Sequence, residues 1–280
     1  MGQTLQEIVD QLTGIDDIFF FKLAENKGFC EELLQVILEN KNLKIVEHKP
    51  QAVLRNIKGR SVTLDLKCTD ENGVIFGVEV QKQDNDNHQK RVRYNMANLD
   101  TAESEKGVTF DELKDIYEIY ISKFDMFGRN KTVYHIDRIV RETQEVVNNG
   151  THEIYVNTKV DDGTEIAEYM QTLKKPTLPD NPKFPQLCEA FKNIKTGMED
   201  GTMCDLVQAY AEEYAKEHVA EYAEEYAKEY ADKQVNKERI KMLVELFNDG
   251  MLSASAAAKK LEIIEEQFLE YVDQYQQQKY

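Results

Sequence analysis

The chain has 280 residues, of which 41% are hydrophobic, so it can bury one substantial core and still supply an appendage. It holds no apolar run of about 18 residues and no basic start followed by an apolar segment, so we expect neither a membrane span nor a signal peptide. The four cysteines show no Cys-x-x-Cys pair and no zinc-like spacing, which predicts reduced thiols in a cytoplasmic protein.

The formal net charge of −17 argues at first against a polyanionic partner. Residues 199–233 alone carry 11 acidic and 3 basic side chains, a net charge of −8, which leaves −9 for the other 245 residues. The acidity is therefore concentrated in the C-terminal part. The N-terminal body can still present a basic strip to a nucleic acid.

The predicted helix at residues 29–38 carries two acidic side chains, Glu31 and Glu32, among apolar residues that recur at helical spacing. Another acidic pair, Asp16 and Asp17, comes earlier in the chain and precedes an apolar run. A glutamate on this helix would complete a metal site if the helix lay close to the strands that follow. For either glutamate taken singly, a solvated acidic face is the more ordinary interpretation.

Residues 61–83 predict two antiparallel strands, because β-rich stretches flank Asn72-Gly73, one of the strongest short hairpin signals. Side chains alternate across a strand, so Asp65 lies on one face of the first strand, and Glu79 and Gln81 share a face of the second. If the register brings these faces together, the two carboxylates converge. Mg²⁺ prefers oxygen ligands and keeps several waters, so such a pair suits it. The alternative is the polar face of an exposed hairpin.

The other elements of the N-terminal body follow from the same patterns. We expect strands over residues 44–55, 115–123, 133–137 and 152–157, and helices over residues 89–96 and 186–195. A turn of helix carrying Arg138 and Arg141 should follow the third of these strands. His135 and His152 lie beside no nucleophile and in no metal-ligand spacing, so we interpret both as polar residues on strand faces.

The predicted helix at residues 89–96 opens with a basic cluster followed by an aromatic residue: Lys90, Arg91, Arg93 and Tyr94. Guanidinium forks match phosphate oxygens, which makes Arg91 and Arg93 candidates for phosphate binding. Salt bridges to the carboxylates of the hairpin are the alternative.

Past residue 171 the composition changes. Residues 174–185 hold four of the five prolines and predict an extended linker. Residues 209–233 place Tyr or His at every fourth position among Ala and Glu, which predicts a long acidic helix, either an exposed spacer or a surface for self-association. Residues 236–275 predict two or three short helices that resemble half of a helix-turn-helix. The would-be recognition helix is acidic, which favours partner binding or a homo-oligomer over DNA reading.

Several of these segments together resemble one family. The core is Asp65 in Leu-Asp-Leu with Glu79 and Gln81 in Val-Glu-Val-Gln, accompanied by the segments at 17–20, 90–94, 134–136 and 154–157. This combination resembles the PD-(D/E)XK nuclease family transposases, a group related to the recombination-promoting nucleases of bacteria, over residues 14–175. The resemblance implies an α/β fold with a restriction-endonuclease-like core, a mixed β-sheet flanked by helices, and here an α-helical C-terminal extension.

The resemblance also implies a site. Asp65 and Glu79 would bind Mg²⁺, or alternatively Mn²⁺, for hydrolysis of a DNA phosphodiester. Glu31, or with less support Glu32, would match the helical glutamate that some members add. The residues expected to contact DNA are Lys90, Arg91, Arg93 and Tyr94.

Gln81 stands where the wider superfamily has lysine, although glutamine is usual in this subgroup. A lysine ammonium can stabilise charge on the scissile phosphate, whereas an amide can only position the attacking water. Lys82 points to the opposite face of the strand and does not simply substitute. Three outcomes stay open: Gln81 suffices beside the metal, Arg91 or Arg93 supplies the cation, or activity is weak.

The sequence therefore predicts a Mg²⁺-dependent DNA endonuclease of the mobile-element type. Two alternatives are a catalytically quiet nucleic-acid or protein binding module that assembles through its C-terminal helices, and a non-enzymatic helical scaffold. We expect a nuclease-like domain at residues 1–175, a linker with a packing helix at 176–198, an acidic helix at 199–235 and a helical tail at 236–280.

Overall fold

A computed structural model describes residues 10–55, 59–84, 87–104, 107, 109–196, 240–261 and 263–277. The chain divides into two compact units, Met1–Tyr210 and Ala211–Tyr280. The predicted acidic helix at residues 209–233 lies outside the described residues. Within the described ranges, no helix combines the length and the apolar content needed to cross a membrane.

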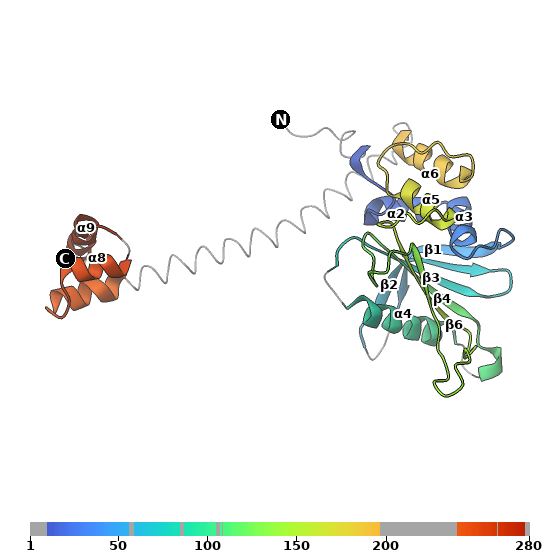
Figure 1. The fold of residues 1–280 in the computed structure, drawn as a ribbon, viewed down its shortest axis with the longest axis horizontal. Helices are drawn as coiled ribbons and strands as arrows, with labels where there is room; N and C mark the ends of the chain where they lie inside the picture. Colours follow the sequence, from blue (N-terminus) through green and yellow to red (C-terminus); the bar gives the residue numbers. More distant parts are fainter. Residues whose placement is uncertain are drawn as a thin grey trace. The chain divides into compact units, whose positions relative to one another are not determined.

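The first unit is built on one six-stranded sheet with the order β1-β2-β3-β4-β6-β5 (Figure 1). The strands are β1 (Ile45–Leu54), β2 (Val62–Asp70), β3 (Ile75–Gln81), β4 (Ile116–Ser122), β5 (Val133–Ile136) and β6 (Thr151–Asn157). β1, β2 and β3 pair antiparallel, β3, β4 and β6 pair parallel, and β5 pairs antiparallel with β6. The predicted mixed sheet is confirmed.

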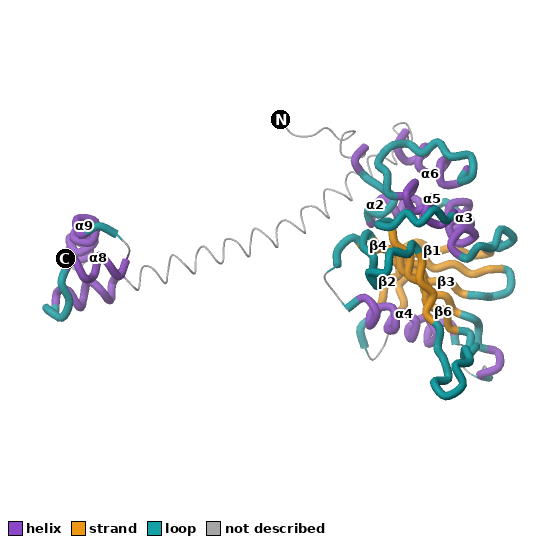
Figure 2. Tube along the Cα trace, viewed as in Figure 1, coloured by secondary structure: helices purple, strands orange, loops and turns teal. Residues whose placement is uncertain are grey.

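Helices cover both faces of the sheet (Figures 1 and 2). One face carries α2 (Asp17–Ala24), α3 (Lys27–Ile37), α5 (Glu165–Leu173) and α6 (Pro185–Thr196), and the opposite face carries α4 (His88–Glu103). A short 3-10 helix, η1 (Phe110–Glu112), precedes β4. The predicted core of mixed sheet and flanking helices is therefore the fold of this unit.

The two faces of the central strands differ in chemistry. Val78 on β3 and Ile119 on β4 point into the main apolar core, which α2, α3, α5 and α6 complete. Side chains alternate along a strand, so Glu79 and the neighbouring Glu118 point to the face that α4 covers. The fold thus places acidic groups beneath one helix.

The predicted hairpin is confirmed, and its turn is held by Asp70. The Asp70 Oδ1 atom accepts the backbone N–H groups of Asn72 (2.9 Å) and Val74 (2.8 Å). Gly73 has φ of +81°, a left-handed conformation that glycine adopts without a steric cost. This turn sets the register of β2 and β3, with Leu66 opposite Val78.

The helical turn expected at Arg138 and Arg141 is wrong. Residues 137–147 instead form a small hairpin with an antiparallel bridge between Ile139 and Val146. The backbone N–H of Val147 donates to the carbonyl of Arg138 at 2.8 Å. β-branched pairs at both ends of a short polar turn favour extended pairing, which outweighs the local helical tendency of the arginines.

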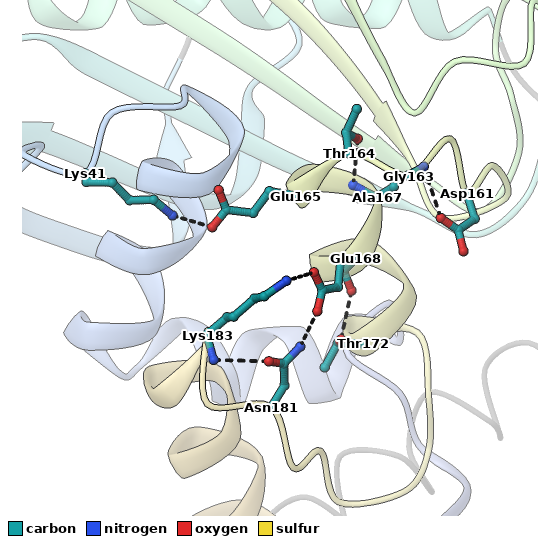
Figure 3. Close-up of polar contacts among 10 residues, drawn as sticks. All are labelled: Lys41, Asp161, Gly163, Thr164, Glu165, Ala167, Glu168, Thr172, Asn181 and Lys183. Atoms are coloured by element: carbon teal, nitrogen blue, oxygen red, sulfur yellow. Dashed lines mark hydrogen bonds and ion pairs between the residues drawn. The ribbon is translucent and has the colours of Figure 1, made fainter.

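Sequence patterns did not predict α5, whose polar contacts are shown in Figure 3. Its N-cap residue Thr164 accepts the backbone N–H of Ala167 at 3.1 Å. Glu168 binds Lys183 (2.6 Å) and Asn181 (2.9 Å), so α5 anchors the proline-rich segment. That segment is not helical, as predicted. Pro185 then begins α6, a position where proline's missing N–H removes no helical hydrogen bond.

The second unit has a small core of its own. Residues 240–248 are helical, and α8 (Ala254–Leu261) and α9 (Glu265–Gln277) follow. Their buried apolar side chains are Leu243, Val244, Ala257, Ala258, Phe268 and Val272. The predicted set of short helices is confirmed for the described part of this unit.

Candidate active site

Asp65 and Glu79 lie together where β2 and β3 begin to separate. The last paired residues are Leu66 and Val78, and the same antiparallel register puts Asp65 opposite Glu79. The Asp65 Oδ2 atom accepts the backbone N–H of Val80 at 2.7 Å. Glu79 is buried, with 2% of its surface exposed. The structure therefore brings the two predicted carboxylates to one place.

The environment of these carboxylates disfavours their negative charge. Burial raises the pKa of Asp65 to about 6, and the nearby charge of Asp17 adds to the shift. Burial also raises the pKa of Glu79 to about 9, and repulsion from Asp65 and then Glu118 contributes. Such shifts arise when acids that are removed from water lack enough positive charge nearby, so a bound cation would favour the ionised form of both residues.

A third buried acid, Glu118, was missed by the sequence analysis. It lies on β4 beside Gly77 of β3, where an added Cβ at Gly77 would stand 2.3 Å from the Glu118 Oε2 atom. Burial raises the pKa of Glu118 to about 8. The Oε2 atom is buried and has no hydrogen-bond partner among the described residues. The signal was a single glutamate inside the apolar stretch Ile-Tyr-Glu-Ile-Tyr-Ile.

Asn95 of α4 joins two of these acids. Its Nδ2 group donates to Glu79 Oε1 at 3.2 Å and to Glu118 Oε1 at 2.9 Å. The side chain is buried beneath α4. One amide therefore binds both carboxyl groups, and the second oxygen of Glu79, Oε2, faces Arg91 instead.

Arg91 is the member of the predicted basic cluster that reaches the acids. Its Nη1 atom donates to Gln81 Oε1 at 3.1 Å, and its Nη2 atom lies 3.5 Å from Glu79 Oε2. Gln81 Nε2 also donates to the carbonyl of Gln83 at 3.1 Å. The arginine and the glutamine are thus held as one unit at the open end of the site.

The other basic-cluster residues lie away from the carboxylates. Lys90 is exposed on the first turn of α4, and Arg93 is exposed and lines a cavity beside that helix. The Tyr94 hydroxyl donates to the carbonyl of Arg60 at 2.6 Å. These three residues lie on the exposed surface of α4 and do not contact the two carboxylates.

Glu31 and Glu32 are engaged elsewhere. The Glu31 carboxylate binds Lys44 Nζ at 2.7 Å and the Ile45 N–H at 3.1 Å. Ile45 pairs with Asp70, which is about 17 Å along β2 from Asp65 at ~3.4 Å per residue. Glu32 accepts the first N–H groups of α6 at 3.0 and 2.9 Å. The structure does not bring either glutamate to the pair.

Asp17, at the start of α2, is the helical acid that acts on the pair, since its charge contributes to raising the pKa of Asp65 and Glu79. Lys82 Nζ lies 3.3 Å from Asp16 and 3.9 Å from Asp17. As predicted, Lys82 lies on the opposite face of the strand from Gln81, and its ammonium group contacts Asp16 and Asp17.

The comparisons with known proteins identify the family. The family model of the PD-(D/E)XK nuclease family transposases matches residues 19–238. The chain belongs to this family. Neither the comparison with curated proteins nor the comparison with solved structures gives a match. The matched residues include Asp65, Glu79 and the whole of α4, so the family assignment covers the site described above.

PD-(D/E)XK nucleases generally use divalent metals, and the donor atoms here suit such an ion. Within the described ranges, no group of three or more His, Cys, Asp or Glu side chains is arranged to hold a metal. Asp65 and Glu79 supply two oxygen ligands, and Mg²⁺ is commonly held by one or two carboxylates with waters completing its shell. A dication would also offset the repulsion that raises the pKa of both residues.

Proposed function

We propose that this family member is a divalent-metal-dependent deoxyribonuclease that hydrolyses DNA phosphodiester bonds. The observation that carries the proposal is the pairing of Asp65 with Glu79. Glu79 is buried, Asp65 is partly buried, and the two acids share one nearby cation, Arg91, so their mutual repulsion is costly and a bound cation would reduce that cost. The family assignment, whose matched residues include both carboxylates, supports the same conclusion.

In this proposal Asp65 and Glu79 hold the metal, with Mg²⁺ the expected ion. The bound ion would act as a Lewis acid toward the phosphate and lower the pKa of a coordinated water. Asn95 keeps Glu79 in one orientation through its hydrogen bond, so the carboxylate does not have to reorganise.

Arg91 and Gln81 supply what the superfamily lysine would otherwise supply. Their 3.1 Å hydrogen bond places a permanent cation beside an amide. Arg91 can donate to a phosphate oxygen, because a guanidinium has five N–H donors and uses few of them here. Gln81 can orient the attacking water. The contact therefore supports the version in which the cation comes from the following helix.

Cleavage of supercoiled plasmid and of single-stranded DNA tests the function. We expect nicking in Mg²⁺, none in EDTA, and at least a hundredfold loss in Asp65→Asn and in Glu79→Gln, as is usual when a group that stabilises the transition state is removed. Glu71→Gln is the matched control, because Glu71 is an exposed acid in the same hairpin. Folding of each variant is checked by circular dichroism.

Absence of cleavage on every substrate by folded, metal-loaded protein would refute the enzyme. Retained DNA binding in that case would favour a catalytically quiet binding module. Equal activity of Glu79→Gln and the parent protein would refute the assignment of the site.

A further inference from the structure

A cavity of about 600 Å³ lies on the flank of α4 away from Arg91. α4, the segment before β4, the hairpin at residues 137–147 and the start of β6 contribute to its walls. Its charged and aromatic lining residues are Arg93, Asp100, Phe110, Lys114, Asp115, Arg138 and Glu153. Pockets of about 300–1,000 Å³ accommodate small organic ligands, so the volume admits a nucleotide.

Two guanidinium groups line this cavity without forming an ion pair among the described residues. Neither Arg93 nor Arg138 has a side-chain hydrogen bond or an ion pair within 4 Å among the described residues. The other arginine of α4, Arg91, does have such partners, Gln81 and Glu79. Unpaired guanidinium groups at a cavity wall attract an anionic group, and their forks match phosphate oxygens.

Phe110 adds an aromatic surface at the same cavity. It is 91% exposed, which makes it the most exposed large apolar side chain in the described chain. Its backbone is fixed by η1, where Thr109 and Glu112 form a capping box. An exposed aromatic ring that lines the same cavity as two arginines is the kind of platform on which a nucleic-acid base stacks.

Acidic residues at the cavity wall disfavour a small anion as the ligand. Glu153 accepts the Tyr155 hydroxyl at 3.3 Å, and Asp115 lies 3.8 Å from His152 Nε2. Their carboxylates repel a bare phosphate but accept hydrogen bonds from the exocyclic amino groups of a base. A ligand with one anionic group and several donors fits this mixed lining better than a simple anion does.

We propose that this cavity binds one nucleotide of a single-stranded DNA segment, with the base stacked on Phe110 and the phosphate held by Arg93 and Arg138. The part of the proposal that makes the segment a piece of the substrate rests on the proposed nuclease function. The base would offer its amino groups to Glu153 and Asp115.

The position of the cavity relative to the carboxylates fits a bound strand. Arg93 follows Arg91 by two residues, which is about 200° around the helix, so the two arginines lie on opposite flanks of α4. A strand joining the two places crosses the exposed surface of the helix, where Lys90 and Tyr94 lie. The helix is about 10–12 Å wide, so a short run of nucleotides spans it.

The test is fluorescence anisotropy with the full chain in EDTA and a short, fluorescein-labelled single-stranded DNA. We expect Phe110→Ala to weaken binding by about five- to a hundredfold, the usual loss when a stacking ring is removed. Arg138→Ala should lower the slope of log affinity against log salt by about 0.7, as one phosphate contact is lost. The matched controls are Leu178→Ala, an exposed apolar side chain elsewhere, and Arg141→Ala, an exposed arginine of the same hairpin. Both should bind like the parent protein.

Competition separates the ligand classes. Deoxyadenosine monophosphate should displace the labelled strand at lower concentration than inorganic phosphate does, and the Phe110→Ala change should remove that difference. Equal competition by the two compounds would overturn the proposal, because it would show an anion site only. Binding that is unaffected by Phe110→Ala and Arg138→Ala would overturn it as well.

The same measurement in the Asp65→Asn variant separates this inference from the nuclease function. Binding that depends on Phe110 should be unchanged there, although cleavage is lost. If the parent protein cleaves nothing but binding still depends on Phe110, the cavity proposal stands and the nuclease proposal fails. If the protein cleaves DNA but binding ignores Phe110 and Arg138, the cavity proposal alone fails.

Discussion

The two faces of β3 and β4 are equally buried but carry side chains of different chemistry. On one face, Val78 and Ile119 are fully buried among the apolar side chains of four helices. On the other, Glu79 and Glu118 are just as well buried but carry ionisable groups that one amide, Asn95, connects. Burial therefore stabilises one face and, on the other, disfavours the ionised form of two acids.

Lys195, another buried ionisable residue, is accommodated in a different way. The Lys195 ammonium group is buried, and it donates to the carbonyls of Asp10, Leu12 and Pro176. Those contacts join α6 to the segment before α2 and to the proline-rich segment. The lysine is satisfied by backbone oxygens, whereas Glu118 keeps a buried oxygen without a partner in the described chain. The buried lysine therefore stabilises the fold, whereas buried acids with raised pKa values are the kind of group that clusters at functional sites.

The largest expected effect comes from the apolar face. Ile119→Ala should lower the free energy of unfolding by about 2–5 kcal/mol, since it removes buried methyl groups and leaves a cavity. Urea denaturation measures the loss, and Val46→Ala on β1, where the side chain is 61% exposed, is the control with little change. Cleavage per folded molecule should stay near the parent value. A loss well below 1 kcal/mol would contradict the packing of this face.

On the acidic face, Glu118→Gln should raise the free energy of unfolding rather than lower it. The pKa of Glu118 is raised to about 8 from an ordinary value of 4.5, so ionisation in the folded state costs stability as pH rises between these values. The variant cannot ionise, and its advantage in EDTA should grow from near zero at pH 4.5 to roughly 1–3 kcal/mol above pH 8.

Thermal unfolding from pH 4.5 to 8.5 measures this trend. Glu71→Gln, which removes an exposed acid of the hairpin, should show no such dependence on pH. A constant difference between Glu118→Gln and the parent protein across the range would show that Glu118 is not held in its neutral form.

The smallest expected effect is the stabilisation by metal. Mg²⁺ at ten times its dissociation constant should raise the free energy of unfolding by about 1.4 kcal/mol, because only the folded state unites Asp65 and Glu79. Melting curves with and without EDTA measure this, and Asp65→Asn and Glu79→Gln should both lose the increment. An equal increment in the variants would place the metal elsewhere.

The hairpin that carries the pair was predictable because it depends on a local rule, the turn signal Asn72-Gly73 between two β-rich stretches. The opposition of Asp65 and Glu79 was predicted only on the condition of one register, because a shift by one residue turns every side chain to the other face. In the structure the Asp70 N–H donates to the Val74 carbonyl across the turn and Leu66 lies opposite Val78, which is the register that brings the two carboxylates together. The polarity of 209–233 was equally visible, but that segment lies outside the described residues.

The helical acid could not be predicted in the same way. Glu31 and Asp17 both precede the hairpin on helical segments, and only the packing of α2 and α3 on the sheet separates them. α3 directs Glu31 to Lys44 and Ile45, at the far end of β2, while Asp17 at the start of α2 acts on the pair. The helix pattern states which residues share a face, not which strand that face meets.

By itself, the sequence determined the hairpin, because it depends on residues close together in the chain, and the family, because several of its segments recur along the chain. The tertiary structure decided the register that sets Asp65 opposite Glu79, brought in Glu118 and Asn95, and selected Arg91 rather than Arg93 as the arginine beside the pair. Glu118 arrives through the parallel pairing of β3 with β4, and Asn95 and Arg91 through the docking of α4. Those contacts are non-local, and a one-dimensional pattern does not specify which strands become neighbours.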